Sequence, residues 1–268
     1  MKQAIKRLIP RSLWERMRQW RITSGLSRFE RSVCEHTYGN DRFKVVLADG
    51  LSKGWYDKDW PVQTEMELLA TSRLIPGARV FDLGAHQGIV AMMMSRIVHN
   101  DGAIIAVEGM THNCQVLREN LALNSITNVT VRNNVVAHQT GRHQFFNGLN
   151  GSVARDGVGE WIDATTVDVL TREIGSPQVV FIDIEGFEEK ALQGATETLA
   201  LPCDWFVEVH TGCGLEEYGG SVQRVLAFFP NDKFHRFNWM LDSDDKPKVL
   251  DKDSHAPLKR FGLVAIHR

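Results

Sequence analysis

A glycine-containing turn between an apolar run and a helical pattern is the segment most suited to chemistry. Asp82 lies near the end of the run 79–83, and Gly84 and Gly88 flank the turn that follows. Glycines let a backbone turn sharply and approach a ligand closely. The Gly-x-x-x-Gly spacing differs from the Gly-x-Gly-x-x-Gly of dinucleotide-binding turns, which disfavours an NAD-linked oxidoreductase. Asp82 there offers an anion to a cationic ligand group; an ordinary tight turn is the alternative.

A second acidic residue strengthens this interpretation. Glu108 follows the apolar run 103–107 and lies 26 residues after Asp82. A carboxylate at the tip of a second strand can accept hydrogen bonds from both hydroxyls of a ribose. Taken alone, Glu108 fits a solvated strand end equally well. Together with the glycine turn, it predicts a site for an adenosine-containing ligand.

Alternating apolar runs and helical patterns must position these acids. We expect strands at 79–83, 103–107, 128–132, 179–184 and 205–209. Helical patterns lie near 88–99, 111–124, 166–174, 187–200 and 221–229. This alternation predicts a parallel sheet with helices on both faces. Two later β-like runs, 233–239 and 261–267, are expected to form an antiparallel pair at one sheet edge. The glycine-rich stretch 148–159 is expected to be a loop.

Residues 1–60 are predicted to form a basic extension, and residues 61–268 the main domain. A helix is expected at 4–20, a hairpin at 33–49 and, at the start of the main domain, a helix at 62–75. Residues 1–31 carry nine basic and two acidic side chains, although the whole chain has a formal net charge of −2. We hypothesise that this arm docks on an anionic or membrane-associated partner, or packs on its own domain or a second subunit.

Composition narrows the class of protein. The chain has 268 residues, of which 43% are hydrophobic and 24% charged, as in ordinary globular domains. Apart from the arm the chain is acidic, which argues against nucleic-acid binding. Its four cysteines lack a close pair, which argues against a zinc site and a disulfide framework. We find neither a membrane-spanning run nor a secretory signal pattern, and we predict a cytoplasmic enzyme.

Five blocks of the sequence resemble the FkbM family of S-adenosylmethionine (SAM)-dependent methyltransferases. They are 80–88, 106–109, 113–124, 179–188 and 205–210. In that family the second strand typically ends in Glu-Pro, and an Asn and then Leu-x-x-Asn-x-x-x-Asn follow. The matching residues here are Asn113, Leu117, Asn120 and Asn124, whereas Gly109 replaces the Pro. The block 179–188, VVFIDIEGFE, is the most characteristic signature. The resemblance covers about residues 80–210.

This resemblance implies an α/β fold of the class I SAM-dependent methyltransferase type, a Rossmann-like sandwich. The sheet would be mostly parallel, with the antiparallel pair at its C-terminal edge. SAM is the implied cofactor. Its methionine part would contact Asp82, Gly84, Ala85 and Gly88, and Glu108 would hold the ribose. Asn134 and Val135 would edge the adenine, and His86 and Asn113 are further candidates for cofactor contacts.

Strand-end side chains supply the candidates for catalysis. Asp183, Glu208 and His210 follow the fourth and fifth strands, where ligands of open α/β sheets bind. A hydroxyl is a poor nucleophile at neutral pH, so Asp183 or a neutral His210 is expected to serve as base. Structural roles are the alternative for both, and Glu185 is expected to orient its turn. Asp183, Glu185 and Glu208 have the oxygen ligands that Mg²⁺ prefers, but such acids commonly lie together without a metal, and we expect none.

The resemblance implies O-methylation of a carbohydrate or a small natural product. The predicted partner is therefore a small-molecule or glycan acceptor, not a nucleic acid. Two alternatives stay open. The acceptor atom can be nitrogen, or the chain can be a SAM-binding partner module that has lost catalysis.

Overall fold

The fold is described by a computed structural model, which covers residues 28–146, 150–154, 159–241, 245–251 and 256–268, with Gly25 and Ser254. The helix expected at 4–20 lies outside these residues, as does most of the basic arm, so the docking hypothesis stays a prediction. Within the described part, no helix has the length and apolar character needed to cross a membrane.

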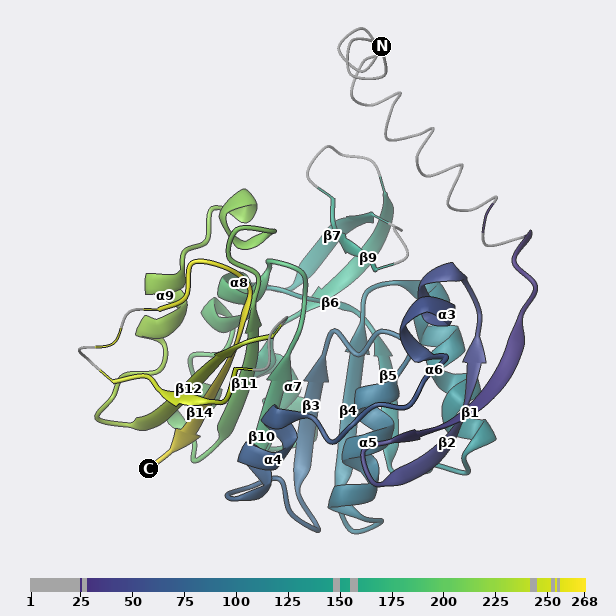
Figure 1. The fold of residues 1–268 in the computed structure, drawn as a ribbon. Helices are drawn as coiled ribbons and strands as arrows, with labels where there is room; N and C mark the ends of the chain where they lie inside the picture. The colour runs from purple at the N-terminus through teal and green to yellow at the C-terminus, as the bar shows by residue number, and fades with distance from the viewer. Residues whose placement is uncertain are drawn as a thin grey trace, which may run out of the picture.

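An eight-stranded sheet forms the centre of the fold (Figure 1). Its strand order is β13-β12-β14-β11-β10-β3-β4-β5. The parallel strands are β3 (Arg79–Leu83), β4 (Ala103–Glu108), β5 (Val129–Asn133), β10 (Val179–Ile182) and β11 (Asp204–Val209). The antiparallel strands are β12 (Phe234–Met240), β13 (Lys248–Val249) and β14 (Phe261–His267). The predicted parallel sheet with an antiparallel C-terminal edge is confirmed, and β14 lies inside that edge, between β11 and β12.

Helices cover both faces of this sheet, because successive strand side chains point to opposite faces. Val80 and Ile104 pack into one core with α4 (Thr64–Ala70), α5 (Ile89–Val98) and α6 (Thr111–Leu123). Phe81 and Ile105 pack into the opposite core with α7 (Val167–Ile174), α8 (Glu188–Gln193) and α9 (Val222–Ala227). Two short 3-10 helices complete this layer, η1 (Thr198–Ala200) and η2 (Leu215–Tyr218). The predicted helical segments are therefore confirmed, with α4 and α8 shorter than expected.

The predicted N-terminal hairpin is present as β1 (Ser32–Tyr38) and β2 (Asp41–Leu47). It lies against α6 (Figure 1). Asn120 of α6 accepts the backbone N–H of Val46 at 2.8 Å, and the side chain of Asn124 accepts that of Lys44 at 2.9 Å. Two asparagines of the family-like run thus attach the hairpin to the sheet domain. A helix that the sequence did not predict, α3 (Gly50–Tyr56), follows β2.

A second, four-stranded sheet was also not predicted. Its strands are β6 (Val135–Val136), β7 (Gly141–Phe146), β8 (Ser152–Val153) and β9 (Glu160–Thr165), in the order β6-β9-β7-β8. Figure 1 shows β6, β7 and β9 above the ends of the central strands. Strand β8 falls within the glycine-rich stretch 148–159 that we expected to be a loop. The small sheet closes one side of the cavity described below.

Candidate active site

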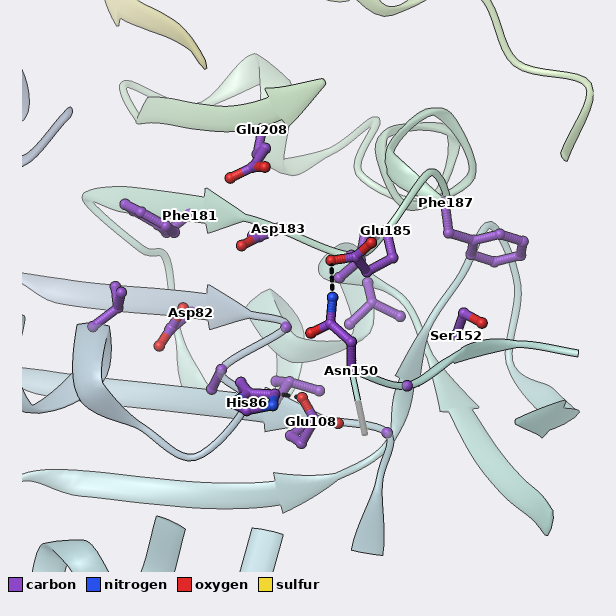
Figure 2. A pocket seen from close by; sticks show the side chains of 18 of the residues that line it. Asp82, His86, Glu108, Asn150, Ser152, Phe181, Asp183, Glu185, Phe187 and Glu208 are labelled. Atoms are coloured by element: carbon purple, nitrogen blue, oxygen red, sulfur yellow. Dashed lines mark hydrogen bonds between the residues drawn. The ribbon is translucent and has the colours of Figure 1, made fainter. Parts of the chain in front are cut away.

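A cavity of about 260 Å³ lies at the carboxyl ends of β3, β4, β10 and β11 (Figure 2). It is bounded by α3 on one side and by the small sheet on the other. Most predicted site residues line it, namely Asp82, Gly84, Ala85, His86, Glu108, Asn134, Val135, Asp183 and Glu208. Three predicted site residues do not line it, namely Gly88, Asn113 and His210.

The glycine turn brings β3 into direct contact with β10. Gly84 has φ +94°, and a Cβ at this position would lie 1.8 Å from the carbonyl oxygen of Asp183. Gly88, at φ +89°, begins α5, and a Cβ there would lie 2.6 Å from Cγ of Leu117. Neither position accommodates a side chain without displacing its neighbour. Gly84 therefore shapes the cavity wall itself, whereas Gly88 fixes the helix behind it.

The carboxylate of Asp82 borders the cavity, and one of its oxygens lacks a hydrogen-bond partner among the described residues. The side chain is 2% exposed, and that oxygen is Oδ2. Burial and the nearby charge of Glu108 raise the pKa of Asp82 to about 7. A buried, unpaired carboxylate is costly, and a ligand cation would relieve that cost. Asp82 thus fits the ammonium group of a methionine moiety.

Glu108 is held in place by the backbone of the turns beside it. Its carboxylate accepts the backbone N–H groups of His86, at 2.9 Å, and Met110, at 2.7 Å. Burial raises the pKa of Glu108 to about 7, although these hydrogen bonds oppose the shift. These bonds hold the carboxylate at the cavity, where ribose hydroxyls could also donate to its oxygens.

Asn113 supports the glycine turn from beneath. It is fully buried, and its Oδ1 lies 3.3 Å from Nε2 of Gln87, which also donates to Asp49 at 2.8 Å. Asn134 lines the cavity and donates from Nδ2 to the carbonyl oxygen of Asp163 at 3.1 Å. Its neighbour Val135 is buried in the small sheet.

An aromatic wall completes the cofactor side. Trp55 and Tyr56 of α3 line the cavity together with Trp60. The Tyr56 hydroxyl lies 2.6 Å from Nδ1 of His86, and the Trp55 and His86 rings are 5.4 Å apart. Sequence reasoning missed α3, although Asp49 and Ser52 form a capping box that marks its start.

Four carboxylates surround His210, which directly follows β11. Nδ1 of His210 lies 2.8 Å from Oε1 of the fully buried Glu188. Nε2 lies 3.3 Å from Glu208 and 3.7 Å from both Asp183 and Glu185. Burial lowers the pKa of His210, but Glu188 and the other acids outweigh it and raise the pKa to about 10.

These surroundings change the interpretation of His210. A protonated imidazole has no lone pair with which to accept a proton, so the raised pKa of His210 disfavours the neutral base that the sequence suggested. His210 is also buried behind the cavity wall rather than in the cavity. The sequence missed Glu188 as its partner, which falls in the family-like block but was assigned no role.

Asp183 faces both the histidine and the cavity. Its Oδ1 is buried without a hydrogen-bond partner among the described residues, whereas the side chain as a whole is 41% exposed. Its burial and the charge of Glu208 hold the pKa of Asp183 well above its usual range, although His210 opposes the shift. Glu208 in turn lies 3.2 Å from Nη1 of Arg260, a cavity residue that the sequence did not reveal.

The small sheet is tied to this acidic side through Glu185. Glu185 and Gly186 both have positive φ, +54° and +97°, in the turn between β10 and α8. The side-chain amide of Asn150, just before β8, donates to Glu185 (Figure 2). Ser152 and Phe187 line the cavity nearby. This side of the cavity therefore combines carboxylates, an amide, a hydroxyl and an aromatic ring.

One family model matches part of this chain. The family model of protein-L-isoaspartate(D-aspartate) O-methyltransferase matches residues 60–141. These residues include Asp82, the glycine turn and Glu108. A search of curated proteins finds no match.

Similar solved structures include methyltransferase FkbM from Methylobacillus flagellatus KT, at 16% identity and a TM-score of 0.47, over 70% of this chain and 43% of that protein. A SAM-dependent methyltransferase from Aquifex aeolicus aligns at 15% identity and a TM-score of 0.44, over 82% of this chain and 94% of that one. An rRNA methylase from Streptococcus thermophilus aligns at 10% identity and a TM-score of 0.48, over 77% and 96%. This chain thus spans less than half of the FkbM protein.

The family-model match and the observed topology agree with the prediction from sequence. The α/β fold is that of class I SAM-dependent methyltransferases. SAM is the expected cofactor, and the chain's own residues fit it, since Asp82 has a buried carboxylate oxygen without a hydrogen-bond partner among the described residues and lines the same cavity as Gly84 and Glu108. These findings support a SAM-dependent methyltransferase.

Proposed function

We propose that this chain is an FkbM-like enzyme that methylates a hydroxyl of a carbohydrate or another polyhydroxylated small molecule. The observation that carries the proposal is that one cavity is lined both by the residues suited to bind SAM and by a candidate base. The buried, unpaired carboxylate of Asp82 lies on one side, and Asp183 lies on the other. The family-like block 179–188 supplies the acceptor side, as the resemblance implied.

On the cofactor side, the residues are suited to binding and orienting SAM. When bound, SAM supplies an electrophilic methyl group on a sulfonium. Asp82 would accept hydrogen bonds from its ammonium group, and Glu108 from its ribose hydroxyls. Asn134 and Val135 would edge the adenine, with Trp55 available on the opposite wall. Fixing the methyl donor in this way converts a bimolecular encounter into an oriented one.

On the acceptor side, Asp183 is the proposed base. A hydroxyl must lose its proton as its oxygen forms the new bond to the methyl carbon, while the electron pair of the broken C–S bond stays on sulfur. Asp183 lines the cavity, and its raised pKa means that its carboxylate has a higher proton affinity, which suits a base. Glu208 is proposed to assist, and His210 to act as a positioning residue whose charge offsets part of the negative charge of the acids.

The lining of the cavity supports a neutral, hydroxyl-rich acceptor. Carboxylates at Asp183, Glu185 and Glu208 repel anionic molecules and accept hydrogen bonds from hydroxyls. The ring of Phe187 offers an apolar face to the carbon skeleton of such a molecule. The same acids would attract an amine, so nitrogen methylation is a second candidate that the charge of the cavity favours.

Methyl transfer from labelled SAM decides between these candidates. The full chain would be incubated with a panel of glycans and polyols and a matched panel of primary and secondary amines, with label counted and products identified by mass spectrometry. We expect products with hydroxyl acceptors only. Products with amines alone would replace the oxygen proposal. The protein could instead bind S-adenosylhomocysteine (SAH) yet transfer no label to either panel or to an extract of the cells that produce it. That result would favour the non-catalytic partner module.

A further inference from the structure

Three side chains at the acidic end of the cavity bring their ligand atoms together. Asp183 follows β10, Glu185 lies in the turn to α8, and His210 follows β11. One ligand atom of each lies within 4.8 Å of those of the other two. The parallel pairing of β10 and β11 produces this convergence, because Ile182 pairs with Val207 and the two strand ends meet.

One of these atoms is a buried nitrogen without a hydrogen bond. His210 is 1% exposed, and its Nε2 has no hydrogen-bond partner among the described residues. Its other nitrogen, Nδ1, faces Glu188, which also accepts the backbone N–H of Gly186 at 2.7 Å. Glu188 therefore holds the proton on Nδ1 and leaves Nε2 facing the oxygens of Glu208, Asp183 and Glu185. A carboxylate that orients a histidine in this way is typical of metal sites.

The charges around His210 do not balance. Glu208 pairs with Arg260, which leaves the carboxylates of Asp183, Glu185 and Glu188 beside one imidazole. Three carboxyl groups beside one buried imidazole concentrate negative charge in a small volume, which is costly away from bulk water. A divalent cation between the three ligand atoms would supply the missing positive charge.

We propose that Asp183, Glu185 and His210 bind a divalent metal ion, with Glu188 as the residue that orients the histidine. One imidazole nitrogen with carboxylate oxygens suits Mn²⁺, Fe²⁺ or Zn²⁺ better than an all-oxygen ion such as Mg²⁺. A histidine ligand must be deprotonated at the binding nitrogen, so the ion displaces the Nε2 proton. This site reverses the expectation from sequence that no metal binds.

The position of the ion has a consequence that rests on the proposed function. Asp183 and Glu185 both line the cavity, so the ion would border the acceptor. A cation there would favour the loss of a proton from an acceptor hydroxyl. It would thereby share with Asp183 the task of making the oxygen nucleophilic.

A second group of potential ligands provides a matched control. Cys34, His36 and Asp57 also lie within ligand distance of one another, on the hairpin and at the end of α3. There Nε2 of His36 already has a partner, at 3.0 Å from Asp57, and the group is partly exposed. It therefore lacks the unsatisfied buried nitrogen that distinguishes His210.

The test is direct metal binding by the full chain after treatment with a chelator. Mn²⁺ alone would be titrated without SAM, with the free ion followed by electron paramagnetic resonance and the heat by calorimetry. We expect one site per chain. His210→Gln and Glu185→Gln should each weaken binding by at least about tenfold, in line with the sensitivity of metal sites to their surroundings, and His36→Gln should leave it unchanged. Because Glu185 is 33% exposed, its variant is expected to fold even if the His210 variant does not.

The same samples separate this proposal from the proposed function. SAH would be titrated into each metal-free protein, because Asp82 and Glu108 lie outside the metal site. If Mn²⁺ does not bind, or is lost in His36→Gln and retained in Glu185→Gln, the metal site is wrong whatever the SAH result. If Mn²⁺ binds as expected but SAH does not, the metal site stands and the methyltransferase proposal fails.

Discussion

The hydroxyl of Tyr56 lies 2.6 Å from Nδ1 of His86, which joins α3 to the glycine turn of the cofactor cavity. We expect Tyr56→Phe to keep the fold, because the ring still fills its place, and to weaken SAH binding by about 2- to 10-fold, the worth of one hydrogen bond. Calorimetric titration measures the change. Trp161→Phe, at a surface position 53% exposed, is the control, and equal affinities in both variants would show that the link does not matter.

Alanine variants at Gly84 and Gly77 provide a matched comparison that tests the close approach of the turn after β3 to Asp183. Both have positive φ, but a Cβ at Gly84 would meet the carbonyl oxygen of Asp183 at 1.8 Å, whereas one at Gly77 meets nothing within 4 Å. Gly77→Ala should cost about 1–2 kcal/mol of folding free energy, from backbone strain alone. Gly84→Ala should cost clearly more and abolish SAH binding. Denaturant unfolding compares the two, and equal losses would contradict the steric argument.

In the protein without bound cofactor, the buried carboxyl group of Asp82 should lower the free energy of unfolding as the pH rises. Its pKa is about 7 in the folded chain, against about 3.9 when unfolded. Between these values the folded state holds a proton that the unfolded state lacks, so this contribution to stability falls as pH rises from about 4 to about 7. Asp82→Asn should therefore become more stable relative to the parent at pH 8 than at pH 5, as measured by chemical denaturation. Asp101→Asn, at an exposed position, is the control for the loss of one carboxyl group from the surface.

Cofactor affinity should follow the same ionisation. The ammonium of SAH attracts Asp82 only in its charged form, so binding should strengthen from about pH 6 to about pH 8, with release of a proton as the carboxyl ionises. Calorimetry in two buffers of different ionisation enthalpy counts that proton. Asp82→Asn should bind weakly at every pH. Proton uptake instead of release would rule out this contact.

Asp183→Asn should separate binding from chemistry. The variant keeps the shape of the cavity, so SAH affinity should stay within a few fold of the parent. Methyl transfer should fall by roughly 10²–10⁴, the usual contribution of a general base. Single-turnover measurement with an accepted substrate gives the rate. A variant with near-parental rate would show that positioning alone suffices and that the acceptor is already a good nucleophile.

Local patterns were enough to predict the sheet and to single out Asp82 and Glu108, which line one cavity. Apolar runs and helical spacing located β3, β4 and β10, and the turn after β3 placed Asp82 and Glu108 in one cavity, as observed. The second sheet was missed because β7, GRHQFF, is short and polar and leads into a glycine-rich stretch. Helix α3 was missed because Gly50 and Gly54 lower its intrinsic helix propensity.

The electrostatics of the acceptor side lay beyond sequence reasoning for a different reason. The charge of His210 depends on Glu188, which reaches it from the first turn of α8. Arg260 comes from the segment before the last strand, yet it contacts Glu208. Such contacts join residues far apart in the chain, and no local pattern encodes them.

The place of β14 sets an order on the assembly of the protein during synthesis. Strand β14 pairs with β11 on one side and β12 on the other, although it is the last of the three to leave the ribosome. Until Phe261–His267 emerges, the edge of β11 has no strand on that side, and β12 has only the short β13. Arg260 immediately precedes this strand, so it contacts Glu208 at the cavity only once β14 has joined the sheet. A nascent chain is therefore expected to expose an unpaired β edge on β11 until residues 261–267 have emerged.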